Sequence, residues 1–341
     1  MSKAIWILGA PDPEMEAIER LLRDAGETVV HGMTGTEGSR PEPARRVRPG
    51  ERVTSLSEGV LLAGADAVVV ECRPDTMSGA TSAWLLAGAD AVVVECRLAP
   101  MLDHDPARLR VVDHHAPGDP GYGRPPAEFL PASSLGQVVS IVAASTGYFP
   151  AGAYCGSPDP DPGPGLLTME ADGRWLVSDG AEWAVIPTDL LLVAAADHCL
   201  GAAYRGECPG VEPGALMRWR AESRAAFQRR SVEEVLADVE ATTSALRAAR
   251  TLDLQDGVFV ANMRREPPYP ELPEAAARAG VAYISGPLRG PDGRAKITCS
   301  GPPEVVAAFL RPESLARLGL EDPYGDPARG FAGGYLREVR S

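Results

Sequence analysis

A segment of 13 residues that occurs twice limits the folds open to this chain more than any other feature of its sequence. LLAGADAVVVECR at Leu61–Arg73 recurs without a change at Leu85–Arg97, 24 residues later. The run AVVVEC is typical of a parallel strand buried on both faces of a sheet, because it is continuously apolar and rich in β-branched residues. Each copy therefore predicts a helix end and a buried strand that ends in an acid, Glu71 or Glu95.

Exact identity between the two copies has no structural necessity. Solenoid repeats keep a pattern rather than every residue, and stable solenoids need about three or more units. We therefore interpret residues 61–108 as a local tandem duplication inside one domain.

The flanking segments alternate between strand and helix patterns. Ala4–Ala10 is a short apolar run that ends at Gly and Pro, and Glu14–Ala25 follows with apolar residues at helical spacing. Residues 35–52 are rich in Gly, Pro and Arg, which predicts a loop. Another short strand, LRVV, precedes Asp113-His114-His115. This alternation predicts an α/β fold with a parallel sheet.

Acids and imidazoles stand where these predicted strands and helices end. In open parallel sheets, ligands bind outside the carboxyl ends of the strands. The residues expected there are Asp12 with Glu14, Glu71 or Glu95, and Asp113 with His114 and His115, and an apolar helix pattern adds Asp197 and His198. Carboxylates and imidazoles that converge on one edge are ligands suited to one or two divalent ions such as Mn²⁺.

Charge and cysteine content exclude several classes of protein. The chain has 341 residues and a formal net charge of −14, and a protein that holds long nucleic acid needs a basic face. A small anion held through a metal ion is compatible with this charge. The six cysteines form no C-x-x-C pair, the N-terminus lacks a signal region, and no apolar run approaches the roughly 20 residues that cross a bilayer. We therefore expect a reduced, cytoplasmic protein without a membrane segment.

The order of these motifs resembles that of the DHH phosphoesterase superfamily, which includes RecJ-type exonucleases, nanoRNases, cyclic-dinucleotide phosphodiesterases and exopolyphosphatases. Asp113-His114-His115 resembles its signature, ILGAPDPEMEAI its first motif and AVVVEC its second. Phe129–Val142 is similar to the segment of small and hydroxyl residues that opens the next helix, and Asp189–His198 resembles the fourth motif. The resemblance implies that residues 1–205 form a DHH-type metal-binding catalytic domain with a parallel sheet.

The resemblance also implies metal-assisted hydrolysis of a phosphate ester. One or two Mn²⁺ or Mg²⁺ ions would lower the pKa of bound water and hold phosphoryl oxygens. His115 would lie beside the scissile phosphate as ligand, charge stabiliser or proton donor, with Asp113 and His114 in the same catalytic centre. The implied metal ligands are Asp12, Glu14, Glu95, Asp113, His114 and Asp197.

Two motifs depart from the family pattern. Leu8 stands where several branches have a histidine, and Glu replaces Asp in the second motif. Glu95 lies 18 residues before Asp113 and Glu71 lies 42 before it; the shorter interval favours Glu95 as the ligand, with Glu71 as the alternative. His198 either orients a neighbour or substitutes for the missing histidine.

The chain beyond residue 205 resembles the family less closely. Residues 206–250, with Arg218–Arg250 as the main part, predict a long amphipathic helix that links two lobes. GVFVANM, VAYISG and AKITCSG predict strands, and PELPEAAARAG and PEVVAAFL predict helices between them, so residues 251–341 are expected to form a smaller mixed α/β domain. Arg329, Gly333 and Gly334 are similar to the glycine-bearing substrate loop of the DHH-associated domain, which implies that they bind substrate.

Three functional interpretations follow from these observations. The first is a hydrolase of a small phosphate-containing substrate, a nucleotide or a short oligonucleotide. The second, a pyrophosphatase or polyphosphatase, would need more clustered Lys and Arg in the C-terminal lobe than the sequence has. The third is a catalytically degenerate protein that binds a nucleotide and regulates a partner, which the altered first and second motifs leave open. A homodimer is compatible with each.

Overall fold

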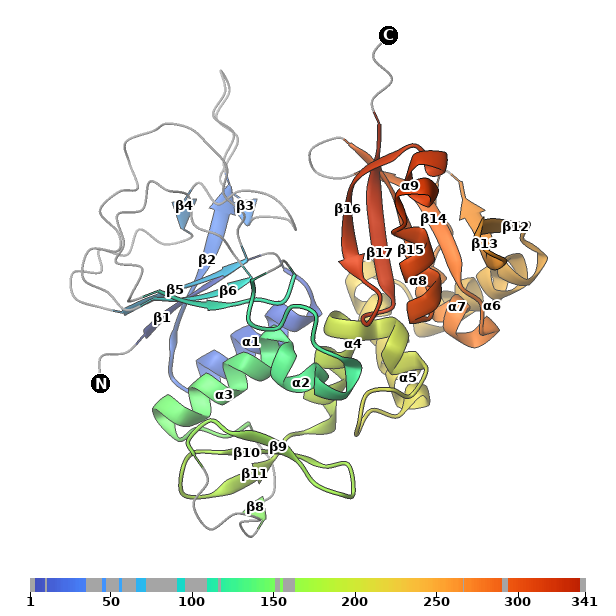
Figure 1. Cartoon of the computed structure of the whole chain (residues 1–341). Coiled ribbons are helices and arrows are strands. Elements are labelled where there is room, and N and C mark those ends of the chain that lie inside the picture. Colours follow the sequence, from blue (N-terminus) through green and yellow to red (C-terminus); the bar gives the residue numbers. More distant parts are fainter. Residues whose placement is uncertain are drawn as a thin grey trace. The chain divides into compact units, whose positions relative to one another are not determined.

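The computed structural model of this chain divides into two compact units. It describes residues 4–9, 11–34, 45–46, 55–56, 66–71, 91–95, 109–115, 118–150, 154–155, 163–265, 267–289 and 294–337. The N-terminal unit comprises Met1–Tyr122 and Leu130–Ala194, and the C-terminal unit comprises Gly123–Phe129 and Ala195–Ser341. Both contain helices and strands (Figure 1), so the predicted α/β class is confirmed as a mixed α/β fold.

The first sheet of the N-terminal unit contains seven of the described strands. Its parallel strands are β1 (Ala4–Leu8), β2 (Thr28–Thr34), β5 (Asp66–Glu71), β6 (Ala91–Glu95) and β7 (Leu109–Val112). Two short strands, β3 (Arg45–Arg46) and β4 (Ser55–Leu56), pair antiparallel with β2.

The prediction of a parallel sheet is therefore wrong in this respect, because the sheet is mixed. β3 lies inside residues 35–52, which the sequence predicted to be a loop. A strand at an open edge has unpaired N–H and C=O groups. β3 and β4 supply hydrogen-bonding partners for those of β2. Over the described strands of both units, antiparallel pairings outnumber parallel ones.

Both copies of the repeated segment contribute a strand to this sheet. Ile5 of β1 pairs in register with Ala67 of β5 and with Ala91 of β6, which are equivalent positions of the two copies. At the other end of these strands, Glu71 and Glu95 are register partners. The two copies therefore take the same register against β1.

Two helices of the N-terminal unit pack against each other, and the start of each is set by its own sequence. α1 (Pro13–Asp24) begins after Asp12, whose side chain accepts a hydrogen bond from Met15 N at 2.8 Å. α3 (Ser134–Thr146) begins after Ser133, whose hydroxyl accepts from Gly136 N at 3.0 Å. Both helices bury an apolar face, and each fully buried Leu, Ile or Met contributes about 1.5–3 kcal/mol. The helix predicted from Glu14 is confirmed.

A second sheet in this unit was not predicted from the sequence. Its strands run in the order β8-β11-β10-β9, all antiparallel. They are β8 (Tyr154–Cys155), β9 (Leu167–Met169), β10 (Trp175–Ser178) and β11 (Trp183–Val185). Strands this short give almost no periodic signal, and the hairpin between β10 and β11 is fixed by Gly180 at φ 101°.

α4 (Thr188–Tyr204) includes the boundary between the units, which falls between Ala194 and Ala195. α2 (Phe129–Ala132) follows a short 3-10 helix, Pro126–Glu128. Among the described residues no single helix is long and apolar enough to cross a bilayer. The pair 126–132 and Ser134–Thr146, bent by 49°, passes that test together, as core helices of globular proteins also do, and α3 is mostly buried in its unit.

The segment predicted as one long linking helix contains two helices. α5 (Pro213–Gln228) ends at Arg229, which has a left-handed φ of 54°. α6 (Val232–Ala248) begins with a capping box, in which Glu234 N donates to Ser231 Oγ at 3.2 Å and Ser231 N donates to Glu234 Oε2 at 2.8 Å. This S-x-x-E signature marks the start of a new helix. The chain therefore turns between α5 and α6, although the apolar spacing alone favours one continuous helix.

The C-terminal unit is built on a mixed, mostly antiparallel sheet with strand order β12-β13-β14-β15-β17-β16. Its strands are β12 (Thr251–Gln255), β13 (Val258–Arg264), β14 (Tyr283–Arg289), β15 (Ala295–Ser300), β16 (Leu320–Asp326) and β17 (Phe331–Leu336). Its remaining helices are α7 (Leu272–Ala279), α8 (Pro303–Phe309) and α9 (Pro312–Leu318). The predicted strands at β13, β14 and β15 and the helices at α7 and α8 are confirmed.

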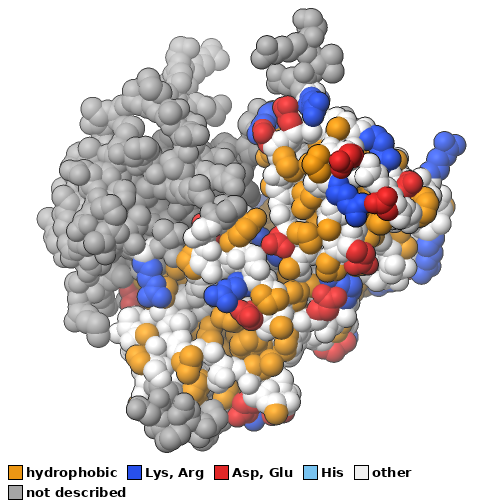
Figure 2. Space-filling view, viewed as in Figure 1, with side chains coloured by type: hydrophobic (Ala, Val, Ile, Leu, Met, Phe, Trp, Pro, Cys, Tyr) orange, Lys and Arg blue, Asp and Glu red, His pale blue; other side chains and the backbone are white. Residues whose placement is uncertain are grey.

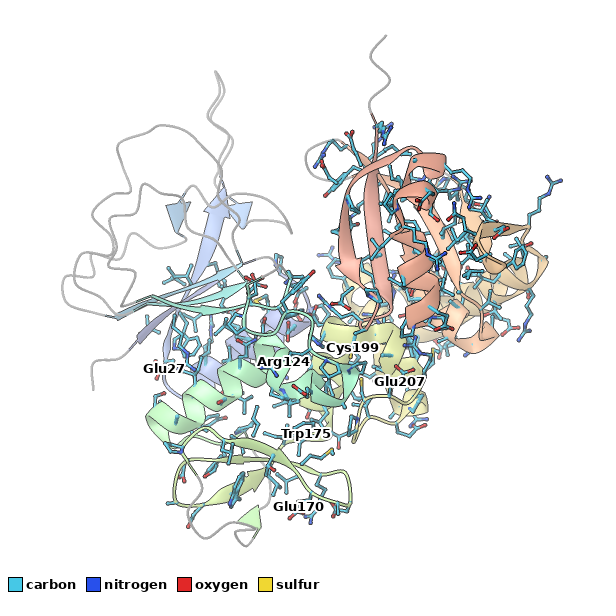
Figure 3. The ribbon with its side chains drawn as sticks, viewed as in Figure 1. Glu27, Arg124, Glu170, Trp175, Cys199 and Glu207 are labelled. Carbon is cyan, nitrogen blue, oxygen red and sulfur yellow. The ribbon has the colours of Figure 1, made fainter. Side chains whose placement is uncertain are left out.

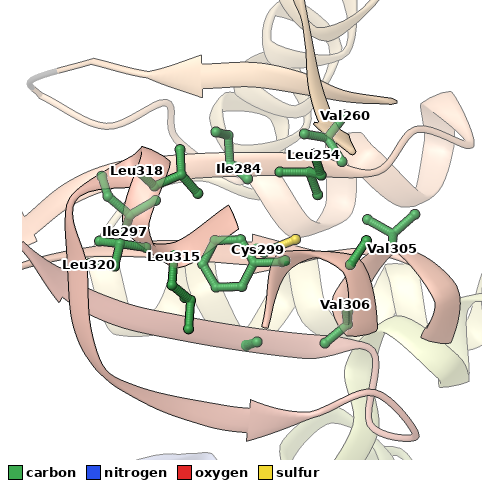
Figure 4. Close-up of a cluster of buried hydrophobic side chains, with 13 residues drawn as sticks. Leu254, Val260, Ile284, Ile297, Cys299, Val305, Val306, Leu315, Leu318 and Leu320 are labelled. Atoms are coloured by element: carbon green, nitrogen blue, oxygen red, sulfur yellow. The ribbon is translucent and has the colours of Figure 1, made fainter. Parts of the chain in front are cut away.

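Helices cover this sheet through two separate apolar clusters. Figure 4 shows Leu254, Ile284 and Cys299 of the sheet packed among Val305 and Leu315 of α8 and α9. A second cluster joins α6 and α7 to residues of β13 and β14. On the visible face of this unit, basic and acidic side chains lie close together (Figure 2). In the same unit, Arg294 and Asp322 form an ion pair at 2.8 Å.

Candidate metal centre

Asp113, His114 and His115 form a compact group directly after β7. Asp113 Oδ1 accepts hydrogen bonds from His114 N at 2.6 Å, from His115 N at 3.0 Å and from His115 Nδ1 at 2.9 Å. One ligand atom from each of the three residues lies within 4.8 Å of the others. Because these three hydrogen bonds all reach Oδ1, Oδ2 is the oxygen through which Asp113 can ligate a metal ion.

The two imidazoles have different surroundings. Their rings are stacked, with centroids 4.2 Å apart. His114 is completely buried and its Nδ1 lies 3.2 Å from Ser134 Oγ at the start of α3. The His115 side chain is 43% exposed. A hydrogen bond at Nδ1 is the kind of contact that orients a histidine ring for ligation through Nε2, so His114 could hold a metal ion, whereas His115 is exposed to solvent.

Glu14 lies close to one member of this group, His114, although it is far away in sequence. A carboxylate oxygen of Glu14 lies within 4.8 Å of a His114 ring nitrogen. Its Oε1 also accepts a hydrogen bond from Leu135 N at 2.9 Å, which joins α1 to the first turn of α3. Glu14 is buried, as expected for a carboxylate that accepts buried donors or ligates a metal.

Asp12 has a defined structural role. Its side chain caps α1, where it accepts from Met15 N at 2.8 Å, and it is not in the group formed by Asp113, His114 and His115 among the described residues. Its predicted role as a metal ligand stays a prediction.

The backbone register bears on the choice between Glu95 and Glu71. Val94 of β6 pairs with Val112 of β7, and these residues directly precede Glu95 and Asp113. β7 has no pairing with β5 among the described strands. The neighbouring strand that leads to the level of Asp113 is therefore the one that ends in Glu95, which agrees with the shorter sequence interval.

Two residues that the sequence analysis did not single out hold the Asp113 loop against α3. Gly121 N donates to Asp113 O at 3.0 Å, and Gln137 Nε2 donates to the same oxygen at 3.3 Å. A Cβ at Gly121 would overlap the Ala132 carbonyl oxygen and lie 2.7 Å from the Cβ of His114, so only glycine fits. The Ser133-Ser134 pair inside the predicted motif was the available signal for the contact with His114.

Asp197 and His198 lie on α4 and belong to the C-terminal unit. His198 is buried and Asp197 is half-buried. The backbone oxygen of His198 accepts a hydrogen bond from Arg329 Nε at 2.6 Å. The ligand role predicted for Asp197 stays a prediction.

The predicted glycine loop is not a loop. Gly333 and Gly334 lie within β17, between β15 and β16. A Cβ at Gly333 would overlap the Tyr324 hydroxyl, so this glycine makes room for a ring on the neighbouring strand. Arg329 lies in the turn before β17, where it holds His198 as described. Whether these three residues bind substrate stays a prediction, but the structure gives each glycine a role in packing.

The electrostatics of the site favour an ionised Asp113. Burial by itself raises the pKa of this carboxyl group, but the hydrogen bonds from the side chain and backbone of His115 and the charges of both histidines lower it overall. Asp113 is therefore a carboxylate at neutral pH, which is the form that ligates a metal ion.

The donor set fits a first-row divalent ion. Carboxylate oxygens and imidazole nitrogens suit Mn²⁺ and related ions, and the orientation of His114 by Ser134 is typical of the residues that support a metal ligand. Comparisons with models of protein families, with curated proteins and with solved structures found no significant match. The function is therefore argued from the site.

Proposed function

We propose that this chain is a divalent-metal-dependent phosphohydrolase of the DHH phosphoesterase kind, acting on a nucleotide or a short oligonucleotide. The observation that carries the proposal is the buried His114, which lies close to Asp113 and also to the buried Glu14, with the exposed His115 beside it. An ionised carboxylate, a buried and oriented imidazole and a second buried acid form a site that binds a cation. A neighbouring exposed imidazole gives it an acid or base.

The residues proposed to hold one or two Mn²⁺ or Mg²⁺ ions are Asp113 through Oδ2, His114 through Nε2, and Glu14. Asp12, Glu95 and Asp197 complete the proposed ligand set on the strength of the sequence motifs. A bound ion supplies two things here: it lowers the pKa of a water molecule and it neutralises charge on phosphoryl oxygens.

His115 is proposed to move a proton at Nε2. Its Nδ1 lies 2.9 Å from Asp113 Oδ1, and a carboxylate at this distance stabilises the protonated ring and fixes its orientation. In a protonated ring the second proton is on Nε2, which can donate it to the oxygen of the leaving group. The exposure of His115 supports this assignment, because a proton donor has to reach the substrate.

The substrate is proposed to be small. The net charge of −14 opposes a long polyanion held along the surface, whereas a metal ion attracts one or two phosphates locally. Pyrophosphate and polyphosphate are the alternatives within the same chemistry, and they would require basic side chains clustered near the ion.

The test is hydrolysis by the metal-free full-length protein with and without added Mn²⁺. The substrates are dinucleotides, cyclic dinucleotides, short oligonucleotides and pyrophosphate, with release of mononucleotide and phosphate followed for each. Asp113→Asn removes the proposed ligand at nearly constant volume. Glu128→Gln, at an exposed acid paired with Arg124, is the matched control.

Turnover that requires both Mn²⁺ and Asp113, and that Glu128→Gln leaves unchanged, is the expected result. The substrate that is cleaved then names the class. Binding of Mn²⁺ or a nucleotide without any turnover would replace the hydrolase with the regulatory interpretation. Failure to bind Mn²⁺ at all would remove the metal site itself.

A further inference from the structure

Two buried thiols lie in contact at the end of α4. Cys199 Sγ and Cys208 Sγ are 3.2 Å apart, and both residues are 2% exposed. Figure 3 labels Cys199 on α4 and Glu207, the residue before Cys208, in the turn that follows. We propose that this pair is an oxidation site, which a hydroperoxide converts into an intramolecular disulfide.

The conformation of α4 brings the first thiol into place. Cys199 has φ −154° and ψ 51°, which are not helical values, and it interrupts α4 between Asp197-His198 and the last turn of the helix. In a regular helix the Cys199 side chain would tilt toward the N-terminus of the helix, as all helical side chains do. The interruption is therefore the local feature that turns Cys199 toward the chain beyond the helix.

The turn after α4 fixes the second thiol. Gly206 N donates to Ala203 O at 3.0 Å and Glu207 N donates to Ala202 O at 3.1 Å, with Gly206 at a left-handed φ of 76°. This is the Schellman arrangement that ends many helices. Val211 N then donates to Cys208 O at 3.1 Å. Backbone hydrogen bonds thus hold Cys208, so the two sulfurs meet without a flexible loop between them.

The surroundings of the pair suit a reversible dithiol. The hydrogen bond from Cys199 and burial raise the pKa of the Cys208 thiol, so Cys208 is a neutral thiol in the reduced protein. Because both thiols are buried, bulky disulfides cannot reach them, and the oxidant we propose is therefore a small hydroperoxide. Oxidation is expected to be slower than at an exposed thiolate, because the thiolate is the reactive form.

The proposed reaction has two steps that balance. One cysteine sulfur attacks a peroxide oxygen, the O–O bond breaks, and a sulfenic acid and one water form. The second sulfur then attacks the sulfenic sulfur, the S–S bond forms and the second water leaves. In total, two thiols lose two electrons and two protons, and one hydrogen peroxide is reduced to two waters.

Cys299 provides a matched comparison within the same unit. It is completely buried in the cluster under β15, and burial raises the pKa of its thiol to about 12. No other described cysteine lies in contact with it. Cys199 and Cys208 have a neighbouring thiol for a fast second step and Cys299 has none among the described residues, so the pair is expected to give a disulfide where Cys299 gives none.

The experiment treats the reduced full-length protein with an excess of hydrogen peroxide, blocks the remaining thiols, and maps tryptic peptides without reduction. Arg205 lies between the two cysteines, so trypsin places them on separate peptides, residues 175–205 and 206–218. Cys299 is on a third peptide, residues 297–317, because trypsin does not cleave between Arg311 and Pro312. The expected product is the first two peptides joined, lighter by two hydrogen atoms than their sum and separated by reductant.

Cys208→Ser is expected to abolish the joined peptides, and Cys299→Ser to leave their yield unchanged. Because the mapping of the natural protein is itself decisive, the proposal stays testable if Cys208→Ser does not fold. Joined peptides that form only after unfolding in urea would overturn it. So would pairing of Cys199 or Cys208 with another cysteine, or oxidation of Cys299 before any joined peptide appears.

Discussion

Glu71 and Glu95 are register partners at the carboxyl ends of β5 and β6. They are the same residue of two identical copies, and both copies take the same register against β1. Among the described strands, β6 but not β5 also pairs with β7, the strand that leads into Asp113. The two identical strands therefore have equivalent pairing with β1, but they differ in their pairing with β7.

Substitution of each acid tests which copy serves the proposed metal site. We expect Glu95→Gln to weaken Mn²⁺ binding by at least roughly tenfold, since even the supporting residues of a metal site are worth about 10–100-fold. Glu71→Gln should leave the affinity unchanged. Titration of the metal-free proteins by calorimetry measures both. The opposite order would assign the functional strand to the first copy.

Deletion of residues 61–84 tests whether the sheet needs both strands. Because the copies are identical, deleting residues 61–84 or 74–97 leaves the same chain, with one AVVVEC strand. β6 pairs with both β1 and β7, so one strand suffices to join them. We expect the shortened protein to unfold cooperatively in urea, with native helix content by circular dichroism. Loss of the cooperative transition would show that the second strand is required.

Local sequence signals predicted much of this fold. The apolar spacing of α1, the continuous apolar strands and the strands and helices from β13 to α8 depend on neighbouring residues, and each was predicted from its own segment. The break between α5 and α6 also had a local signal, Ser231 with Glu234, which the long periodicity obscured. The short strands β3, β4 and β8 to β11 had none, because two to four residues are too few to show the alternation of a strand.

The candidate site divides in the same way. Asp113, His114 and His115 could be singled out because they are adjacent and follow a strand. The bond from Leu135 N to Glu14 and the contact of Ser134 with His114 join residues far apart in sequence, so only the structure gives them. Gly333 and Gly334 show the reverse case, since a glycine pair typical of a loop lies in a strand where a tyrosine needs the space.

Glu14 offers a way to separate structural stabilisation from metal binding. Glu14→Ala removes the acceptor of Leu135 N in a buried place, so we expect a loss of about 1–3 kcal/mol in the free energy of unfolding. Glu14→Gln keeps an acceptor oxygen and should lose less, yet it removes the charge that would hold an ion. Urea unfolding of the metal-free variants measures the first effect, and the increase in stability on adding Mn²⁺ measures the second. Equal stabilisation of Glu14→Gln and the natural protein by Mn²⁺ would exclude Glu14 as a ligand.

A buried ion pair joins α5 to α7 in the C-terminal unit. Arg220 Nε donates to Glu274 Oε1 at 2.8 Å, and Glu274 is 1% exposed. Glu274→Ala leaves a buried guanidinium without its partner, which is expected to cost about 3–5 kcal/mol. Glu240→Ala breaks the exposed pair with Arg278 and should cost less than about 1 kcal/mol. Urea unfolding measures the free energy of unfolding of both variants. Similar losses would contradict the expectation that breaking a buried ion pair costs more than breaking an exposed one.

Replacing both partners of the buried pair tests the same argument from the other side. Arg220→Met with Glu274→Leu removes both charges of this pair, so the double variant should be more stable than Glu274→Ala alone. If the double variant is less stable than Glu274→Ala, the ion pair itself stabilises the folded protein. The loss in Glu274→Ala would then not come from the unpaired arginine alone.

Asp113 predicts a specific dependence of stability on pH in the metal-free protein. Although burial opposes ionisation, the interactions with His115 and His114 lower the pKa of Asp113 below its unfolded value of about 3.9. The unfolded state therefore binds more protons in this range, and the contribution of Asp113 is fully present above the unfolded pKa and is lost as pH falls through the folded pKa. Asp113→Asn should lower stability at neutral pH and should lose less than the natural protein between pH 5 and the folded pKa. Urea unfolding with a chelator present, repeated across this range, measures the difference. Parallel pH profiles for the two proteins would show that the carboxylate of Asp113 gains nothing from the two histidines.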